Sequence, residues 1–166
     1  MGNSILNSLG WFGLKIFIAC SKWNYKFIPY VKNKLEELGH EVILPNYYDD
    51  PMIEERIKKF GSVQDHEEFC KLSFNISRQK SLDSDAILVL NMDKKTEDGY
   101  YYNYVGGATL LEMYDSFLLN HPIYLYNPIP FNMLRDEIIG MQPIVIDGDL
   151  KKIGDTNEKN KIKERI

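Results

Sequence analysis

One carboxylate in the sequence is placed where it could take part in chemistry. Glu112 follows the glycine pair Gly106-Gly107, in a segment predicted to form the first turns of a helix. A carboxylate held beside a bound substrate can act as a nucleophile or exchange a proton with it. On a helical wheel Glu112 lies opposite the apolar residues of this helix, and that spacing alone favours a solvated glutamate. Its position favours a site instead, because the helix begins just beyond the strongest predicted strand, residues 86–90.

Cys20, Ser21 and Lys22 form a second candidate group, between a predicted strand and a predicted helix. Small residues there let backbone N–H groups approach an anion, and the helix N-terminus adds a favourable partial charge. Ser21 could donate a hydrogen bond and Lys22 could supply a positive charge. In the competing interpretation Ser21 or Asn24 only caps the helix, and the two interpretations stand about even. Cys20 is predicted to be a packed thiol, because no arginine follows at the spacing of a phosphatase loop.

Aromatic and glycine patterns limit the classes of ligand that the chain could bind, but they do not identify one. The sequence contains neither GxGxxG nor a Walker A motif, so dinucleotide or ATP binding of those kinds is not supported. Tyr100, Tyr101, Tyr102 and Tyr104 could stack on an aromatic base or cover a neighbouring subunit, and the sequence favours neither.

Alternating apolar patterns predict the elements that must position these residues. Strands are expected at 14–20, 41–45, 86–90, 122–126 and 143–146, and helices at 63–82, 106–120, 131–139 and in a segment ending at Gly39. Residues 46–61 are predicted to be irregular or partly helical, and 92–105 a polar loop. This order predicts an α/β fold, a three-layer, doubly wound sandwich with a mainly parallel five-stranded sheet. Such sheets bind ligands at the carboxyl ends of their strands.

Composition predicts one folded domain in a reducing compartment. The 166 residues are 44% apolar and 27% charged, an ordinary globular balance. The net charge of −4 has no basic stripe, which argues against a nucleic-acid polymer as partner. No apolar run reaches the roughly 20 residues that span a bilayer. Two distant cysteines predict neither a disulfide nor a metal site, so we expect a cytoplasmic protein. An N-terminal appendage at 1–13, a domain at 14–150 and a charged tail at 151–166 are expected.

The order and spacing of several short segments resemble the nucleoside 2-deoxyribosyltransferase-like family. This family includes nucleoside deoxyribosyltransferases and 2′-deoxynucleoside 5′-monophosphate N-glycosidases. The resemblance covers roughly residues 14 to 150. Its parts are 15–21, 38–42, 85–91, 104–112 and 122–125.

The resemblance implies a flavodoxin-like sandwich with Glu112 as the catalytic residue. Glu112 would attack the anomeric carbon of a deoxyribose and release the base, after which water or a second base would resolve the covalent intermediate. The family implies a homodimer or higher homo-oligomer that needs neither a metal nor a cofactor. The residues expected to line the sugar or phosphate are Asn91, Asn103, Tyr104, Gly106, Gly107 and Thr109.

Three positions depart from the family pattern. Ser77 stands where active members usually have an aspartate, Phe17 where the transferases have a tyrosine, and Gly106 where their general acid lies. The position of the nucleophile is retained while its supporting residues are altered. We expect cleavage or transfer at the N-glycosidic bond of a (deoxy)nucleoside or nucleotide. A non-catalytic nucleotide sensor of the same fold and an inert scaffold are the alternatives.

Overall fold

The computed structural model describes residues 13–155, which are built around one parallel sheet. Its five strands run in the order β2-β1-β3-β6-β7, and every neighbouring pair is parallel. Their bounds are Lys15–Ala19 (β1), Glu41–Ile43 (β2), Ala86–Val89 (β3), Ile123–Leu125 (β6) and Ile144–Val145 (β7). This is the flavodoxin-like order, in which the strand sequence reverses between β1 and β3. The predicted doubly wound α/β fold is confirmed.

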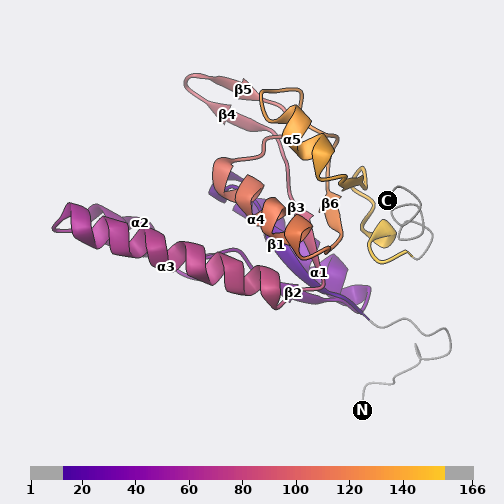
Figure 1. Ribbon diagram of the computed structural model, residues 1–166, viewed down its shortest axis with the longest axis horizontal. Coiled ribbons are helices and arrows are strands. Elements are labelled where there is room, and N and C mark those ends of the chain that lie inside the picture. Colours follow the sequence, from indigo (N-terminus) through magenta and orange to yellow (C-terminus); the bar gives the residue numbers. More distant parts are fainter. Residues whose placement is uncertain (1–12, 156–166) are drawn as a thin grey trace, which may run out of the picture.

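Helices cover both faces of the sheet and make three layers (Figure 1). On one face lies α1 (Ile28–Glu37), preceded by the 3-10 helix η1 (Lys22–Phe27). The other face carries α4 (Gly107–Leu118) and α5 (Arg135–Gly140). Beside α4 lies α3 (Val63–Leu82), which extends well past the body with α2 (Ile53–Lys58) near its outer end (Figure 1). A short 3-10 helix, η2 (Leu150–Lys152), follows β7.

Strands buried on both faces explain the continuous apolar runs in the sequence. Successive side chains of a strand point to opposite faces, so each core takes every second residue. Ile16 and Ile18 of β1 pack in the core under α1, whereas Phe17 and Ala19 pack in the core under α4. All four are fully buried. Phe17, one of the departures from the family pattern, is therefore a core residue.

The helix that carries Glu112 packs differently from what its apolar residues predict. The stripe of α4 that meets the sheet consists of Thr109, Met113 and Ser116, all buried. The more apolar arc, which the helical wheel suggests as the core face, is exposed at Leu111, Tyr114, Phe117 and Leu118. Glu112 is thus adjacent to the buried stripe rather than opposite the core.

The long helix α3 has the predicted bounds but not the predicted packing. Its expected apolar positions, Phe69, Leu72, Phe74 and Ile76, belong to neither core, and Leu72 and Phe74 are exposed. The only buried residue of α3 is Ser81, near its C-terminal end. The helix lies against α4 and projects beyond the sheet, so its outer half has no sheet to pack on (Figure 1).

Other segments refine the predicted boundaries. The expected polar loop 92–105 contains a hairpin of β4 (Lys94–Thr96) and β5 (Gly99–Tyr101), so the prediction of a loop without strands was wrong there. Leu150 and Ile153 are buried, and the packed body therefore runs slightly past residue 150. Most of the predicted appendage and tail, 1–12 and 156–166, lies outside the described residues. Between residues 13 and 155, no helix has the length and apolar character needed to cross a membrane.

Asn91 ties the end of β3 to the loop that follows β6. Its side-chain amide donates to the carbonyl oxygens of Asn127 and Pro128, each at 3.0 Å. Its Oδ1 accepts from the backbone N–H of Asn127 at 2.8 Å. The Asn127 side chain in turn donates to the Asn91 carbonyl oxygen at 3.2 Å. Asn91 is fully buried, so these bonds hold two neighbouring strand ends in register.

We predict that Asn91→Ala lowers the free energy of unfolding by about 2–4 kcal/mol, because it removes three hydrogen bonds and leaves buried groups without partners. Urea denaturation monitored by circular dichroism measures the change. Asn33→Ala, at an exposed position of α1, is the matched control and is expected to change stability by less than about 0.5 kcal/mol. Equal denaturation midpoints for Asn91→Ala and the wild type would contradict this structural role.

Candidate active site

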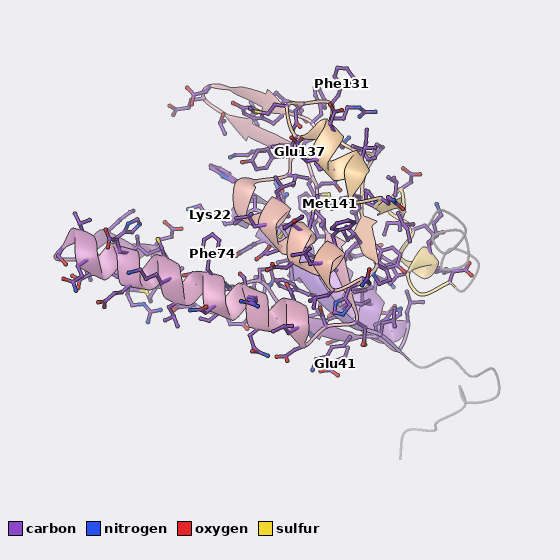
Figure 2. The ribbon with its side chains drawn as sticks, in the orientation of Figure 1. Lys22, Glu41, Phe74, Phe131, Glu137 and Met141 are labelled. Carbon is purple, nitrogen blue, oxygen red and sulfur yellow. The ribbon has the colours of Figure 1, made fainter. Side chains whose placement is uncertain are left out.

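A cavity of about 460 Å³ opens at the carboxyl edge of the sheet, between the start of α4 and the inner face of α3. The loops after β1 and β2 and the short helix α2 complete its walls. In Figure 2 the Phe74 ring rises from α3 toward the side where Lys22 lies, while Glu41 marks the opposite, amino-terminal edge of the sheet. The cavity therefore lies where parallel α/β sheets bind their ligands.

Glu112 faces this cavity and is half-buried. Its Oε1 accepts a hydrogen bond of 2.9 Å from the hydroxyl of Ser77 on α3. The Ser77 Oγ itself accepts a bond of 2.8 Å from the side-chain amide of Asn46, in the loop after β2. The spacing-based prediction of a solvated glutamate is wrong, because α3 covers the flank of α4 that carries Glu112.

The surroundings of Glu112 oppose its ionisation. Burial raises the pKa of this carboxyl to about 7, while the Ser77 hydrogen bond and the positive charge of Lys80 lower the pKa and Asp115 raises it further. Lys80 is on α3, one turn beyond Ser77, and donates to the Leu44 carbonyl oxygen at 2.8 Å. The pKa of Lys80 is itself lowered, chiefly by burial. Glu112 is therefore a carboxyl group that exchanges its proton near neutral pH.

The loop after β1 contributes all three of its predicted residues to the cavity: Cys20, Ser21 and Lys22. Ser21 sits at the N-cap position of η1, but its side chain makes no capping hydrogen bond. Asn24 does not cap either, because its side-chain amide donates to the Leu90 carbonyl oxygen. Side-chain capping, one of the two interpretations of this loop, is therefore not what the structure contains.

Two of these residues are less reactive than their types suggest. Burial, followed by the nearby charge of Glu112, raises the pKa of the Cys20 thiol to about 12, so it stays protonated as the sequence predicted for a packed thiol. The Lys22 ammonium forms an ion pair of 2.6 Å with Glu54 of α2, and both side chains are largely exposed. The positive charge expected from Lys22 is offset at the mouth of the cavity.

Neither glycine at the start of α4 has an unusual backbone conformation, and only Gly107 has open space beside it, because a Cβ atom on Gly106 would lie 3.4 Å from the Tyr104 hydroxyl. Gly106, the N-cap residue, has φ −83°, and neither Gly106 nor Gly107 is among the positive-φ residues. A Cβ atom placed on Gly107 would meet nothing within 4 Å. Both glycines and Thr109 line the cavity, and α4 has no side-chain cap. The first N–H groups of α4 can therefore be approached by a ligand.

Three of the predicted lining residues are not brought to this cavity. Asn91 lies in the strand-end network described above, and its side chain is fully engaged there. Asn103 donates its backbone N–H to Asp93. The Tyr104 ring lies under Lys94 of the hairpin, with 4.4 Å between the ammonium and the ring centroid. Asn103 and Tyr104 thus pack on the hairpin, although the Tyr104 ring also lies beside Gly106, which lines the cavity.

Other lining residues were missed by the sequence analysis. They are Tyr25, Pro45, Asn46, Tyr47, Ile53, Glu54, Ile57, Phe69, Ser73, Phe74, Ala108, Leu111 and Asp115. One signal could have found some of them: Phe69, Ser73 and Ser77 recur every four residues, the spacing of one helical face. Tyr47 stacks on Phe69 with 5.2 Å between ring centroids, which gives the cavity an aromatic wall. Within 13–155, no group of three or more His, Cys, Asp or Glu side chains gathers as a metal site.

Comparisons with known proteins give one structural similarity. No protein-family model matches the chain, and no curated protein sequence does. Among solved structures the chain is similar to a 2-deoxyribosyltransferase from the psychrotolerant bacterium Bacillus psychrosaccharolyticus, described as a biocatalyst for nucleoside synthesis. The sequence identity is 20%, the similarity covers 74% of this chain and 80% of that chain, and the TM-score is 0.48.

We predict that burial of Glu112 makes stability depend on pH with a defined sign. Its pKa rises from 4.5 in the unfolded chain to about 7 in the fold. The unfolded chain therefore loses this proton first, and stability falls as pH increases from 4.5 to 7. Glu112→Gln lacks this loss and should gain up to about 3 kcal/mol over the wild type between pH 4 and pH 8. Urea denaturation of both proteins at pH 4 and pH 8 measures their free energies of unfolding. If the difference between the two proteins is the same at both pH values, the burial of this carboxyl is contradicted.

Proposed function

We propose that the chain cleaves or transfers the N-glycosidic bond of a (deoxy)nucleoside or nucleotide, with Glu112 as the nucleophile. The observation that carries the proposal is the half-buried carboxylate of Glu112, which accepts a hydrogen bond from Ser77 and faces a cavity of about 460 Å³. This volume lies within the range of small-molecule sites. A carboxylate fixed beside an anomeric carbon is the central requirement of retaining glycoside chemistry.

The proposed reaction needs only groups that the substrate, water and Glu112 provide. The Glu112 carboxylate attacks C1′ as the C1′–N bond breaks, and the bonding electron pair leaves with the base. In hydrolysis a water oxygen then attacks C1′, the bond from C1′ to Glu112 breaks, and the water proton ends on the nitrogen of the released base. In transfer the nitrogen of a second base takes the place of the water. Both routes return Glu112 as a carboxylate.

The cavity walls suit a substrate with one polar and one aromatic half. Glu112, Ser77 and the start of α4 provide hydrogen-bonding groups on one side, where a sugar would lie. Tyr47 and Phe69, which stack on each other, offer an aromatic surface on α3 and the loop after β2. An aromatic surface favours a planar base through stacking and burial. This division supports a nucleoside rather than a simple sugar.

Gly106 has no proton to donate from a side chain at the position of the family's general acid. The proposed reaction therefore has water or the base itself supply proton transfer to the leaving nitrogen. Bases that leave readily as neutral or easily protonated species are expected to react fastest, because general acid assistance contributes about 10²–10⁴-fold where it is present.

We predict that the wild type releases free base from at least one member of a panel of nucleosides and 5′-monophosphates, and that Glu112→Gln lowers the rate at least 10³-fold with an unchanged fold. Chromatography of the reaction mixture detects the base. The rate should rise with pH through about 7, because the nucleophile must be ionised. Thermal stabilisation by a nucleotide without base release would instead identify a sensor, and neither response would indicate a scaffold.

The charges that line the cavity predict a preference for uncharged substrates. Among residues 13–155, Lys22 is the only lysine or arginine that lines the cavity, and it is paired with Glu54, whereas Glu112 and Asp115 add negative charge. We expect a nucleoside to have a higher kcat/KM than its 5′-monophosphate. Glu54→Gln should narrow this difference by releasing the charge of Lys22. Glu55→Gln, on the exposed surface of the same helix, is the matched control. An equal preference in wild type and Glu54→Gln would contradict the role of this ion pair.

A further inference from the structure

Three serines on α3 share one face, yet the middle one makes a different hydrogen bond. A serine within a helix commonly donates its hydroxyl to the carbonyl oxygen four residues earlier. Ser73 does so, donating to Phe69 at 2.7 Å, and Ser81 does so, donating to Ser77 at 3.3 Å. Ser77 instead donates to Glu112 at 2.9 Å. A cause for this exception must lie outside the helix, because the three residues are alike in type and spacing.

Asn46 supplies that cause. Its side-chain amide donates to the Ser73 carbonyl oxygen at 2.9 Å, the acceptor that Ser77 would otherwise use. That oxygen also accepts the helical N–H of residue 77, so both of its lone pairs are occupied. The same amide donates to Ser77 Oγ at 2.8 Å. A hydroxyl that accepts from Asn46 keeps one proton to donate, and Glu112 is the acceptor within reach.

We propose that Asn46 is a positioning residue that turns the Ser77 hydroxyl away from its own helix and toward Glu112. The inference rests on the proposed function in taking Glu112 as the nucleophile. The chain of bonds runs in one direction, from amide to hydroxyl to carboxylate, so it favours a carboxylate that accepts over a carboxylic acid that donates. The Tyr25 hydroxyl donates to the backbone carbonyl oxygen of Asn46 at 3.1 Å, which helps to fix the main chain from which this side chain extends.

Other groups act on Glu112 from the elements packed around it. Lys80 on α3 favours the ionised form, and Asp115 on α4 disfavours it. Burial is the main cause that raises the pKa values of Cys20, after β1, and Tyr25 of η1, and the charge of Glu112 raises both further, so both groups stay protonated near neutral pH. A variant of Asn46 leaves all four of these side chains in place, and the acceptor of the Tyr25 hydroxyl is the main chain of residue 46, which the substitution keeps. A change in the titration midpoint of Glu112 in such a variant would therefore reflect the loss of the hydrogen bonds that run from Asn46 through Ser77 to Glu112.

The test measures the titration of Glu112 without any substrate. The side-chain carboxyl carbon of Glu112 is followed by nuclear magnetic resonance in isotopically labelled protein, with its signal assigned by its absence in Glu112→Gln. In Asn46→Leu the Ser73 carbonyl becomes available, the Ser77 hydroxyl turns back to it, and the titration midpoint of Glu112 should rise by about one pH unit. Ser77→Ala should raise the midpoint by a similar amount.

The double variant separates a hydrogen-bond chain from two independent effects. If Asn46 acts through Ser77, Asn46→Leu combined with Ser77→Ala shifts the midpoint no further than Ser77→Ala alone. Ser81→Ala, which removes a hydroxyl from the same helix without touching Glu112, should leave the midpoint unchanged. If Asn46→Leu folds poorly, Asn46→Ala removes the same amide and serves the same comparison. Additive shifts, or no shift in either Asn46 variant, would overturn the proposal. An absence of base release in the wild type would overturn only the proposed function.

Discussion

The packing of α3 against the flank of α4 is the constraint on which the candidate site depends. It covers Glu112 enough to raise the pKa of its carboxyl to about 7, and it brings Ser77 within hydrogen-bond distance. Without α3, Glu112 would be the solvated residue that its place on the helical wheel suggests. Burial raises the pKa of the Glu112 carboxyl, whereas the hydrogen bond from Ser77 lowers it. The balance of the two effects places the pKa near neutral pH.

The fold could be predicted from the sequence because the sheet is buried on both faces. Runs such as 16–19 and 86–89 are apolar throughout, which is typical of a strand buried on both faces of a parallel sheet. The helix at 63–82 has the bounds predicted from its apolar positions, and in the structure the Ser62 hydroxyl caps its first turn by accepting from the N–H of Asp65. The β4–β5 hairpin was missed because its strands are short, polar and paired only with each other.

Only some of the residues that line the site could be predicted from the sequence, and there is a physical reason why the others could not. Glu112 and the loop at Cys20, Ser21 and Lys22 line one cavity, as expected, because strand ends and helix starts in this fold meet at one edge of the sheet. Asn46 was missed because its role depends on which carbonyl oxygen it occupies on a distant helix, and residue type does not encode that contact. Asn91 was expected at the ligand, since it follows the central strand, but it bonds the neighbouring strand end instead.

Ser77, which stands where the family that the sequence resembles usually has an aspartate, accepts a hydrogen bond from Asn46 and donates one to Glu112. A serine carries no charge, so it cannot replace a carboxylate that binds sugar hydroxyls. It also adds no negative charge beside Glu112, where a second carboxylate would raise the pKa of the first still further. In a cavity that already holds Asp115 and Glu54, a neutral donor is the residue type that allows Glu112 to ionise near pH 7. Under the proposed function, a serine at position 77, where the family that the sequence resembles usually has an aspartate, is therefore compatible with Glu112 as the nucleophile, provided that Asn46 keeps the serine hydroxyl directed toward Glu112.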